Sequence, residues 1–208
     1  MTSSAAKMGL DAVYLDTKTL ILVECVLLAV CEFATFLSPF AARKLMHSAS
    51  GFMMLFLDPS DWLARYFVYS VVVSSLFMVW SPVAPIKFRY SRDKDVGITV
   101  YLIIVGLFFY TQTPLAIIRP VFFADPCGAV VGKWLSRNFP KQNPSWIGNK
   151  TVGGTLAVFV AGFFSLTFGN TIQRILIAAA IAIAEGLSKD YDNLFIAFVV
   201  VCSYFLVV

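Results

Sequence analysis

The sequence is an almost unbroken succession of apolar segments joined by short polar loops. Only 13% of its 208 residues are charged and 59% are hydrophobic, whereas soluble domains average about 25% charged residues. Such runs predict an all-α fold, a polytopic membrane helix bundle with about seven to eight short transmembrane helices. We place these segments at about Leu20–Leu37, Leu45–Leu57, Trp62–Trp80, Gly97–Gln112, Pro114–Val131, Thr155–Phe168, Ile172–Leu187 and Leu194–Val208.

The apolar segments leave no room for a separate soluble domain. We therefore expect an N-terminal tail over residues 1–19 and a single membrane-embedded domain over residues 20–208, with any site built from helix ends and short loops. The tail carries Asp11 and Asp16 and lacks an Ala-x-Ala-like cleavage site, which argues against a transit or signal peptide. Whether the short segment Leu45–Leu57 spans the membrane stays open.

Basic residues predict the orientation of the chain. If all eight segments span, four alternate loops fall on one side of the membrane and together hold 11 of the 16 lysines and arginines, while the short opposite loops hold none. Basic loops face the cytoplasm. The four loops contribute Arg43 and Lys44, then Lys87, Arg89, Arg92 and Lys94, then Lys133, Arg137, Lys141 and Lys150, and finally Lys189.

The stretch from Arg119 to Gly154 carries the strongest functional signal. Asp125 lies well inside an apolar segment, and a carboxylate in that position is costly enough to be a functional-site hypothesis by default. The stretch continues as a basic loop that is rich in Pro and Asn. The same topology brings His47, Glu185 and Asp192 to the cytoplasmic face.

Structural interpretations remain open for several of these residues. The cysteines lack metal-ligand spacing and read as apolar packing residues. The basic loop at residues 81–96 is typical of lipid-facing anchors, and Gly128 with Gly132 is typical of close helix packing. Other polar residues have structural readings of the same kind: Asp190 and Asp192 as a helix cap, Glu24 and Glu32 as hydrogen-bonding groups within the bundle, and Asp125 as the partner of Arg119.

The chain contains no P-loop, protein-kinase, His-Glu-x-x-His or Gly-x-Ser-x-Gly motif. Phosphoryl or nucleotidyl chemistry by charge placement remains, because such transfer needs metal-binding carboxylates and cations for the phosphates. Asp125 with Glu185 or Asp192 would supply the carboxylates, and His47 or a carboxylate would accept a proton. Backbone amides at the glycines after Lys150 would approach an anion. The candidate phosphate-binding cations are Arg43, Lys44, Lys133 and Lys150.

Four ordered motifs resemble the CTP-dependent lipid kinase family, which includes dolichol kinase, phytol and farnesol kinases and the CTP-using diacylglycerol kinase of fungi. They cover most of the chain, and each is weak alone. The motifs are Arg43-Lys44-x-x-His47-x-x-x-Gly51; Arg92-x-Lys94-Asp95-x-Gly97; Ala124-Asp125-x-x-Gly128-x-x-x-Gly132-Lys133 followed by Lys150-Thr151-x-Gly153-Gly154-Thr155; and Glu185 with Tyr191-Asp192-Asn193-Leu194. Pro126, Gly153 and Tyr191 depart from the family pattern.

The resemblance implies a membrane enzyme that transfers the γ-phosphate of CTP to a lipid alcohol, either an isoprenoid alcohol or diacylglycerol. It implies Mg²⁺ as cofactor, with Asp125 and Asp192 as metal ligands. The implied catalytic residues are Asp125, His47, Glu185 and Asp192, and the implied nucleotide- or phosphate-binding residues are Arg43, Lys44, Asp95, Gly128, Gly132, Lys133, Lys150, Thr151, Gly154 and Asn193.

Two other functions compete with this interpretation. Phosphatidate cytidylyltransferase also uses CTP, Mg²⁺ and lipid, but its C-terminal Lys-Asp and His-Gly-Gly signature is missing here. A small membrane transporter is the non-enzyme alternative. We expect the endoplasmic reticulum, or a plastid membrane, as the location, with the active site facing the cytoplasm and no nucleic-acid partner. The particular lipid and the oligomeric state are left open.

Overall fold

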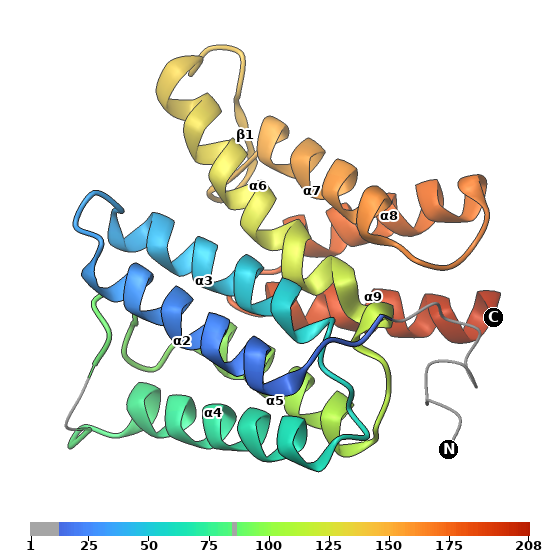
Figure 1. Ribbon diagram of the computed structural model, residues 1–208. Coiled ribbons are helices and arrows are strands. Elements are labelled where there is room, and N and C mark those ends of the chain that lie inside the picture. The colour runs from blue at the N-terminus through green and yellow to red at the C-terminus, as the bar shows by residue number, and fades with distance from the viewer. Residues whose placement is uncertain (1–12, 85–86) are drawn as a thin grey trace. The chain divides into compact units, whose positions relative to one another are not determined.

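The described residues of the chain form helices and one small hairpin (Figure 1). The computed structural model describes residues 13–84 and 87–208, so most of the predicted tail over residues 1–19 lies outside the described residues. The chain forms two compact units, Met1–Ala116 and Ile117–Val208, which are described separately. Each of the eight predicted apolar segments is a helix, which confirms the all-α fold class.

The described part of unit 1 holds four helices: α2 (Thr17–Phe33), α3 (Pro39–Met54), α4 (Trp62–Trp80) and α5 (Val96–Tyr110). Each begins after a polar N-cap whose side chain accepts a hydrogen bond from a backbone N–H of the first turn. This satisfies donors that a helix start otherwise leaves unpaired. The four N-caps are Asp16, Ser38, Asp61 and Asp95.

Arg89 binds the backbone carbonyl groups at the C-terminal end of α2 and just after it. Its guanidinium donates hydrogen bonds to the carbonyl oxygens of Cys31, Ala34 and Leu37 at 2.8 to 2.9 Å. Its backbone N–H donates to Glu32 Oε2 at 3.0 Å. This part of the basic loop therefore has a structural role inside the protein, and the lipid-anchor interpretation is wrong for Arg89. The expectation that Glu32 bonds within the bundle is confirmed.

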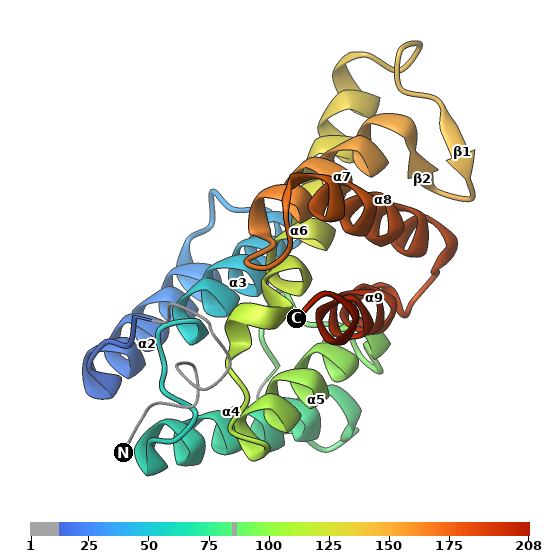
Figure 2. The same cartoon turned by 90° about the vertical axis from the view of Figure 1, so that its right-hand side faces the viewer.

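The 3₁₀ helix η1 (Leu115–Ile118) spans the boundary between the two units in the sequence and continues directly into α6 (Arg119–Asn138), the first helix of unit 2. The hairpin of β1 (Ser145–Ile147) and β2 (Lys150–Thr151) follows, and then α7 (Val152–Ser165), α8 (Thr171–Leu187) and α9 (Asp192–Val207). Helix α6 packs against α7 and α9, and α8 packs against both α7 and α9. Figure 2 shows the hairpin beside the end of α6 and the start of α7.

Helix α6 continues further than the sequence pattern predicts. The apolar segment was expected to end near Val131, but the helix runs to Asn138, so that Lys133 and Arg137 lie on a helix and not in a loop. It ends where Phe139 turns to φ −136°, directly before Pro140. A proline ring disfavours helical backbone at the preceding residue, which explains the stop.

Helices α6 and α7 meet along a strip of glycines. A Cβ at Gly128 would lie 3.2 Å from the Gly154 carbonyl oxygen and would also overlap Val158. A Cβ at Gly132 would lie 3.0 Å from Thr151 Oγ1. The expectation that Gly128 and Gly132 pack two helices closely is therefore confirmed.

Two helical stretches of the described chain are long and apolar enough to cross a membrane, Trp62–Trp80 and Leu115–Asn138. Three more apolar helices are shorter, Val96–Tyr110, Val152–Ser165 and Asp192–Val207. At about 1.5 Å per residue, the 14 residues of α7 cover only part of a hydrocarbon core of about 30 Å. A count of seven to eight spans stays a prediction.

The glycine strip gives a direct test of the α6–α7 packing. We expect Gly128→Ala to lower the free energy of unfolding by about 1–3 kcal/mol, because the added methyl group overpacks the contact with Val158 and Gly154. Gly106→Ala in α5 is the matched control. There the nearest atom lies 3.8 Å away, so the better helix propensity of alanine should leave stability unchanged or raise it by up to about 1 kcal/mol. Equal thermal unfolding of the two variants would contradict the packing argument.

Candidate functional site

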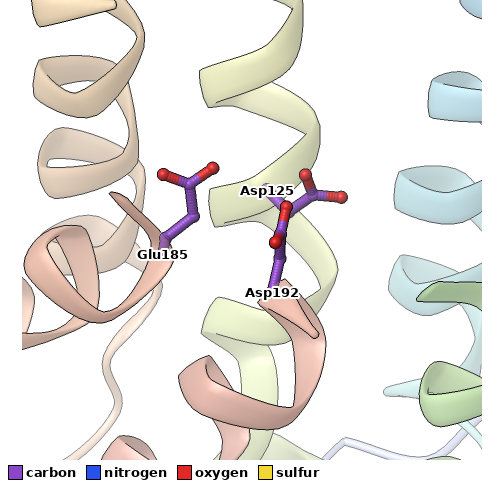
Figure 3. A group of neighbouring side chains, drawn as sticks. All are labelled: Asp125, Glu185 and Asp192. Atoms are coloured by element: carbon purple, nitrogen blue, oxygen red, sulfur yellow. The ribbon is translucent and has the colours of Figure 1, made fainter. Parts of the chain in front are cut away.

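Three carboxylates from three different helices of unit 2 meet at one place (Figure 3). Asp125 comes from the middle of α6, Glu185 from the last turn of α8 and Asp192 from the first residue of α9. One oxygen of each lies within 4.8 Å of the others. Asp125 and Glu185 are buried, and Asp192 is partly exposed. We call these three residues the acidic cluster.

Lys150 joins the acidic cluster from the hairpin. Its Nζ donates a hydrogen bond to Glu185 Oε1 and a second one, at 2.9 Å, to Asp192 Oδ2. Burial lowers the pKa of Lys150, but the hydrogen bonds and charges of the two carboxylates outweigh burial and raise the pKa above its usual value of 10.5. The ammonium group is therefore positively charged at neutral pH.

The hairpin holds Lys150 in position through its turn. Strand β1 pairs antiparallel with β2, with Ile147 opposite Lys150. The two residues between them are Gly148 and Asn149, and Gly148 has φ +54°. A two-residue hairpin turn with a positive φ at its first position favours glycine there. This turn places Lys150 at the start of β2, directly before α7.

Asn143 fixes the loop between α6 and α7 from inside. Its buried side-chain amide donates to the Gly132 carbonyl at 3.1 Å and to Ser136 Oγ at 2.8 Å, and its Oδ1 accepts from the Gly153 N–H at 2.8 Å. One side chain thus ties α6, the loop and α7 together. Sequence reasoning missed Asn143; the Asn-Pro dipeptide marks only a turn.

Trp146 attaches the hairpin to the helices that follow it. Its indole N–H donates to Thr155 Oγ1 at 2.8 Å, and a Cβ at Gly186 would lie 2.5 Å from the indole ring. Gly186 directly follows Glu185 of the acidic cluster. The indole therefore needs a glycine at this point of α8 to pack so closely beside the cluster.

Ser188 orders the connection between α8 and α9. Its hydroxyl contacts the Glu185 carbonyl at 2.8 Å and Asp192 Oδ1 at 2.7 Å. Asp192 thus accepts from Lys150 with one oxygen and from Ser188 with the other.

The residue that caps α9 is Tyr191, without a side-chain hydrogen bond, so the interpretation of Asp190 and Asp192 as N-caps is wrong. No sequence signal distinguished Ser188 from other loop serines.

The first backbone amides of α7 already have partners inside the protein. The Val152 N–H donates to the Pro144 carbonyl at 3.1 Å, the Gly153 N–H to Asn143, and the Gly154 N–H to Thr151 Oγ1 at 3.2 Å. An anion at this helix start would have to displace these bonds. These amides were expected to bind phosphate, but they have no free N–H donors for it. Thr151 is the N-cap of α7.

Other predicted residues of unit 2 lie around the acidic cluster in different roles. Gly128, Gly132 and Gly154 form the α6–α7 contact. Asn193 is buried at the start of α9, next to Asp192. Lys133 is exposed on α6, two helical turns beyond Asp125. Their predicted part in nucleotide binding stays a prediction.

The remaining predicted residues lie in unit 1. Arg43 on α3 forms a 2.5 Å ion pair with Asp95, the N-cap of α5. His47, one turn after Arg43, is buried with its ring 4.4 Å from that of Tyr101. Lys44 lies on the same helix. That these residues join the acidic cluster in one active site stays a prediction.

The donor set of the acidic cluster suits a hard divalent cation. Mg²⁺ prefers oxygen ligands and is usually held by one or two carboxylates together with substrate phosphates. Asp125 and Asp192 fit as ligands because both offer carboxylate oxygens within the 4.8 Å group. Glu185 accepts from Lys150 and holds the ammonium beside them.

No protein-family model, curated protein or solved structure matches this chain. The acidic cluster and Lys150 are therefore the features of this chain from which a function can be inferred. The resemblance to CTP-dependent lipid kinases remains a hypothesis that the four sequence motifs support.

Replacing Lys150 tests whether its ion pairs hold unit 2 together. We expect Lys150→Met to lower the free energy of unfolding by about 3 kcal/mol, because it leaves two largely buried carboxylates without their ammonium partner. Lys141→Met removes an exposed lysine of the same loop and should change stability by less than about 0.5 kcal/mol. Denaturant unfolding in detergent would measure both changes.

The difference between these variants should also depend on pH. A raised pKa means that Lys150 contributes its stability in full below 10.5 and loses it as the pH rises through the folded-state value. Lys150→Met should therefore differ most from wild type near neutral pH and least in strong base. A Lys150→Met protein as stable as Lys141→Met at neutral pH would show that the ion pairs contribute nothing.

Proposed function

We propose that this protein is a membrane lipid kinase that transfers the γ-phosphate of CTP to the hydroxyl group of a lipid alcohol. The observation that carries the proposal is the acidic cluster with Lys150 at its edge, three carboxylates within 4.8 Å and a charged ammonium. Phosphoryl transfer depends on positioned positive charge for the phosphates and carboxylates for a metal and a proton. The choice of CTP follows the motif resemblance.

The exposed surface of α4 supports a membrane location. Six exposed apolar and aromatic side chains form a stripe along the whole helix: Trp62, Tyr66, Tyr69, Val73, Phe77 and Trp80. Tryptophans at both ends are typical of the two membrane interfaces. The 19 residues rise about 28 Å, close to the thickness of a hydrocarbon core. We extend this to a polytopic protein of seven to eight short spans in the endoplasmic reticulum, with its basic loops in the cytoplasm.

Mg²⁺ is the metal proposed for the acidic cluster. Asp125 and Asp192 would hold it, and when bound it would offset the negative charge of the nucleotide phosphates. Lys150 would contribute a fixed positive charge for phosphate oxygens beside them. Lys133 is a second cation on α6. Glu185 would keep the Lys150 ammonium in place through the hydrogen bond that it accepts.

Asp125 would act as the general base of this reaction. The lipid hydroxyl oxygen would attack the γ-phosphorus, the bond from phosphorus to the bridging oxygen would break, and CDP would leave. The hydroxyl proton would pass to Asp125. We assign Asp125 because it lies in the middle of α6, whereas Glu185 and Asp192 lie at helix ends. A hydroxyl arriving from the lipid would meet Asp125 first.

An assay with γ-radiolabelled CTP and a panel of phytol, farnesol, dolichol and diacylglycerol tests the proposal. We expect a radiolabelled phospholipid and CDP as products, in a reaction that needs Mg²⁺. Asp125→Asn should lower the rate at least about 100-fold, as loss of a general base does, while Asp190→Asn, which changes an exposed carboxylate near the cluster, should keep wild-type activity.

Other products would contradict the proposal. CDP-lipid together with pyrophosphate would identify a cytidylyltransferase. No product from any of the four lipids, in protein that unfolds as wild type does, would favour a transporter or another non-enzymatic role. Full activity in folded Asp125→Asn would show that the chemistry lies elsewhere.

A further inference from the structure

Unit 1 contains a cavity that plays no part in the acidic cluster. Its volume is about 240 Å³, somewhat below the range for small-molecule sites of about 300–1,000 Å³. Helices α2 to α5 and the loop before α5 line it. Most of its wall is apolar, with side chains that include Leu28, Met46, Met54, Phe67, Val71 and Met78. An apolar chain would therefore fit the wall.

A polar group interrupts this wall at Glu24. The side chain lines the cavity although the residue is only 7% exposed. It is hydrogen-bonded to Ser50, which is also hydrogen-bonded to Tyr101. The prediction that Glu24 forms a hydrogen bond within the helix bundle is therefore confirmed by its bond to Ser50. Its Oε2 atom, however, is buried and has no hydrogen-bond partner among the residues that the structure describes.

An unsatisfied acceptor at the wall of a cavity points to a ligand that donates a hydrogen bond. Leaving a buried acceptor without a partner costs free energy, and a carboxyl oxygen accepts from an O–H or N–H donor. A ligand that places such a donor at Oε2 would remove this cost. The apolar wall around Glu24 would cover the rest of the molecule.

The charged residues of the cavity favour a neutral donor. Arg43 and Arg92 line it together with Asp95, and Arg92 is exposed to solvent. Arg43 and Ser50 are seven positions apart on α3, which is about 10 Å along the helix axis. An ammonium group would share the cavity with two guanidinium groups, and a carboxylate would meet Glu24. A hydroxyl group meets neither repulsion.

We propose that the cavity of unit 1 binds one apolar chain that ends in a hydroxyl group, and that this hydroxyl donates its hydrogen bond to Glu24 Oε2. The ligand class is a long-chain primary alcohol. The inference does not rest on the proposed kinase function, because it would hold for a protein that binds the alcohol without phosphorylating it.

Photo-crosslinking of the full-length protein in lipid nanodiscs tests this site. The probe is a saturated long-chain primary alcohol with a diazirine within its chain, and the labelled peptides are identified by mass spectrometry. We expect labels on the cavity side of α2 to α5. The unlabelled alcohol should compete about three- to tenfold better than its methyl ether, which cannot donate, since one net hydrogen bond contributes about that factor.

Two variants separate the hydroxyl contact from the cavity itself. Glu24→Met should abolish the preference for the alcohol over its ether while the apolar chain still binds. Ser75→Phe should fill the cavity and reduce labelling by both probes, whereas Ser74→Phe, at an exposed position beside it that does not line the cavity, should label as wild type. Thermal unfolding of each variant verifies that it is folded.

Three results would overturn the proposal. Equal competition by alcohol and ether in wild type would remove the hydroxyl contact. Labels confined to residues outside the cavity wall would remove the site. Stronger competition by the matching amine or carboxylic acid would show that the cavity selects a charged head group.

Discussion

The close contact between α6 and α7 determines how unit 2 is arranged. Three glycines allow it, because side chains at Gly128, Gly132 or Gly154 would fill the space between the two helices. The short connection between these helices is then folded back as a hairpin. Asn143 donates to the Gly132 carbonyl of α6 and accepts from the Gly153 N–H, which the start of α7 would otherwise leave unpaired.

The contact also explains why a lysine reaches the acidic cluster. Lys150 lies directly before α7, so the position of α7 on α6 decides where the ammonium group can lie. Helix α8 packs on α7 and helix α9 packs on α6, which brings Glu185 and Asp192 to the ammonium group. A site that draws on α6, β2, α8 and α9 therefore depends on helix packing more than on any single loop.

The positions of the helices could be predicted from the sequence because apolar runs and their polar ends are local signals. Trp62–Trp80 has the predicted bounds, and α8 begins one residue from its predicted start. The end of α6 was misplaced because the apolar segment stops near Val131, whereas the helix itself continues to Asn138, shortly before the proline at 140. Asp125, Glu185 and Asp192 could be selected because each carboxylate lies in or beside an apolar segment.

The contacts that organise the site could not be predicted in the same way. Asn143 and Ser188 resemble ordinary loop residues in the sequence. Only the folded structure shows which groups their side chains bond to. The partners of Lys150 are 35 and 42 residues away. The unpartnered Glu24 oxygen likewise depends on how α2 packs. The helical pattern of a sequence predicts which face of the helix carries the glutamate, but it does not predict which hydrogen bonds the glutamate forms.

The two hydrogen bonds of Lys150 have a consequence for the entropy of ligand binding. A lysine side chain in water samples many rotamers, and ordering it costs about 2 kcal/mol. Here Glu185 and Asp192 already restrict the Lys150 ammonium when the protein folds. An anion that binds beside it would not have to immobilise a flexible side chain, so more of its electrostatic attraction would remain as affinity.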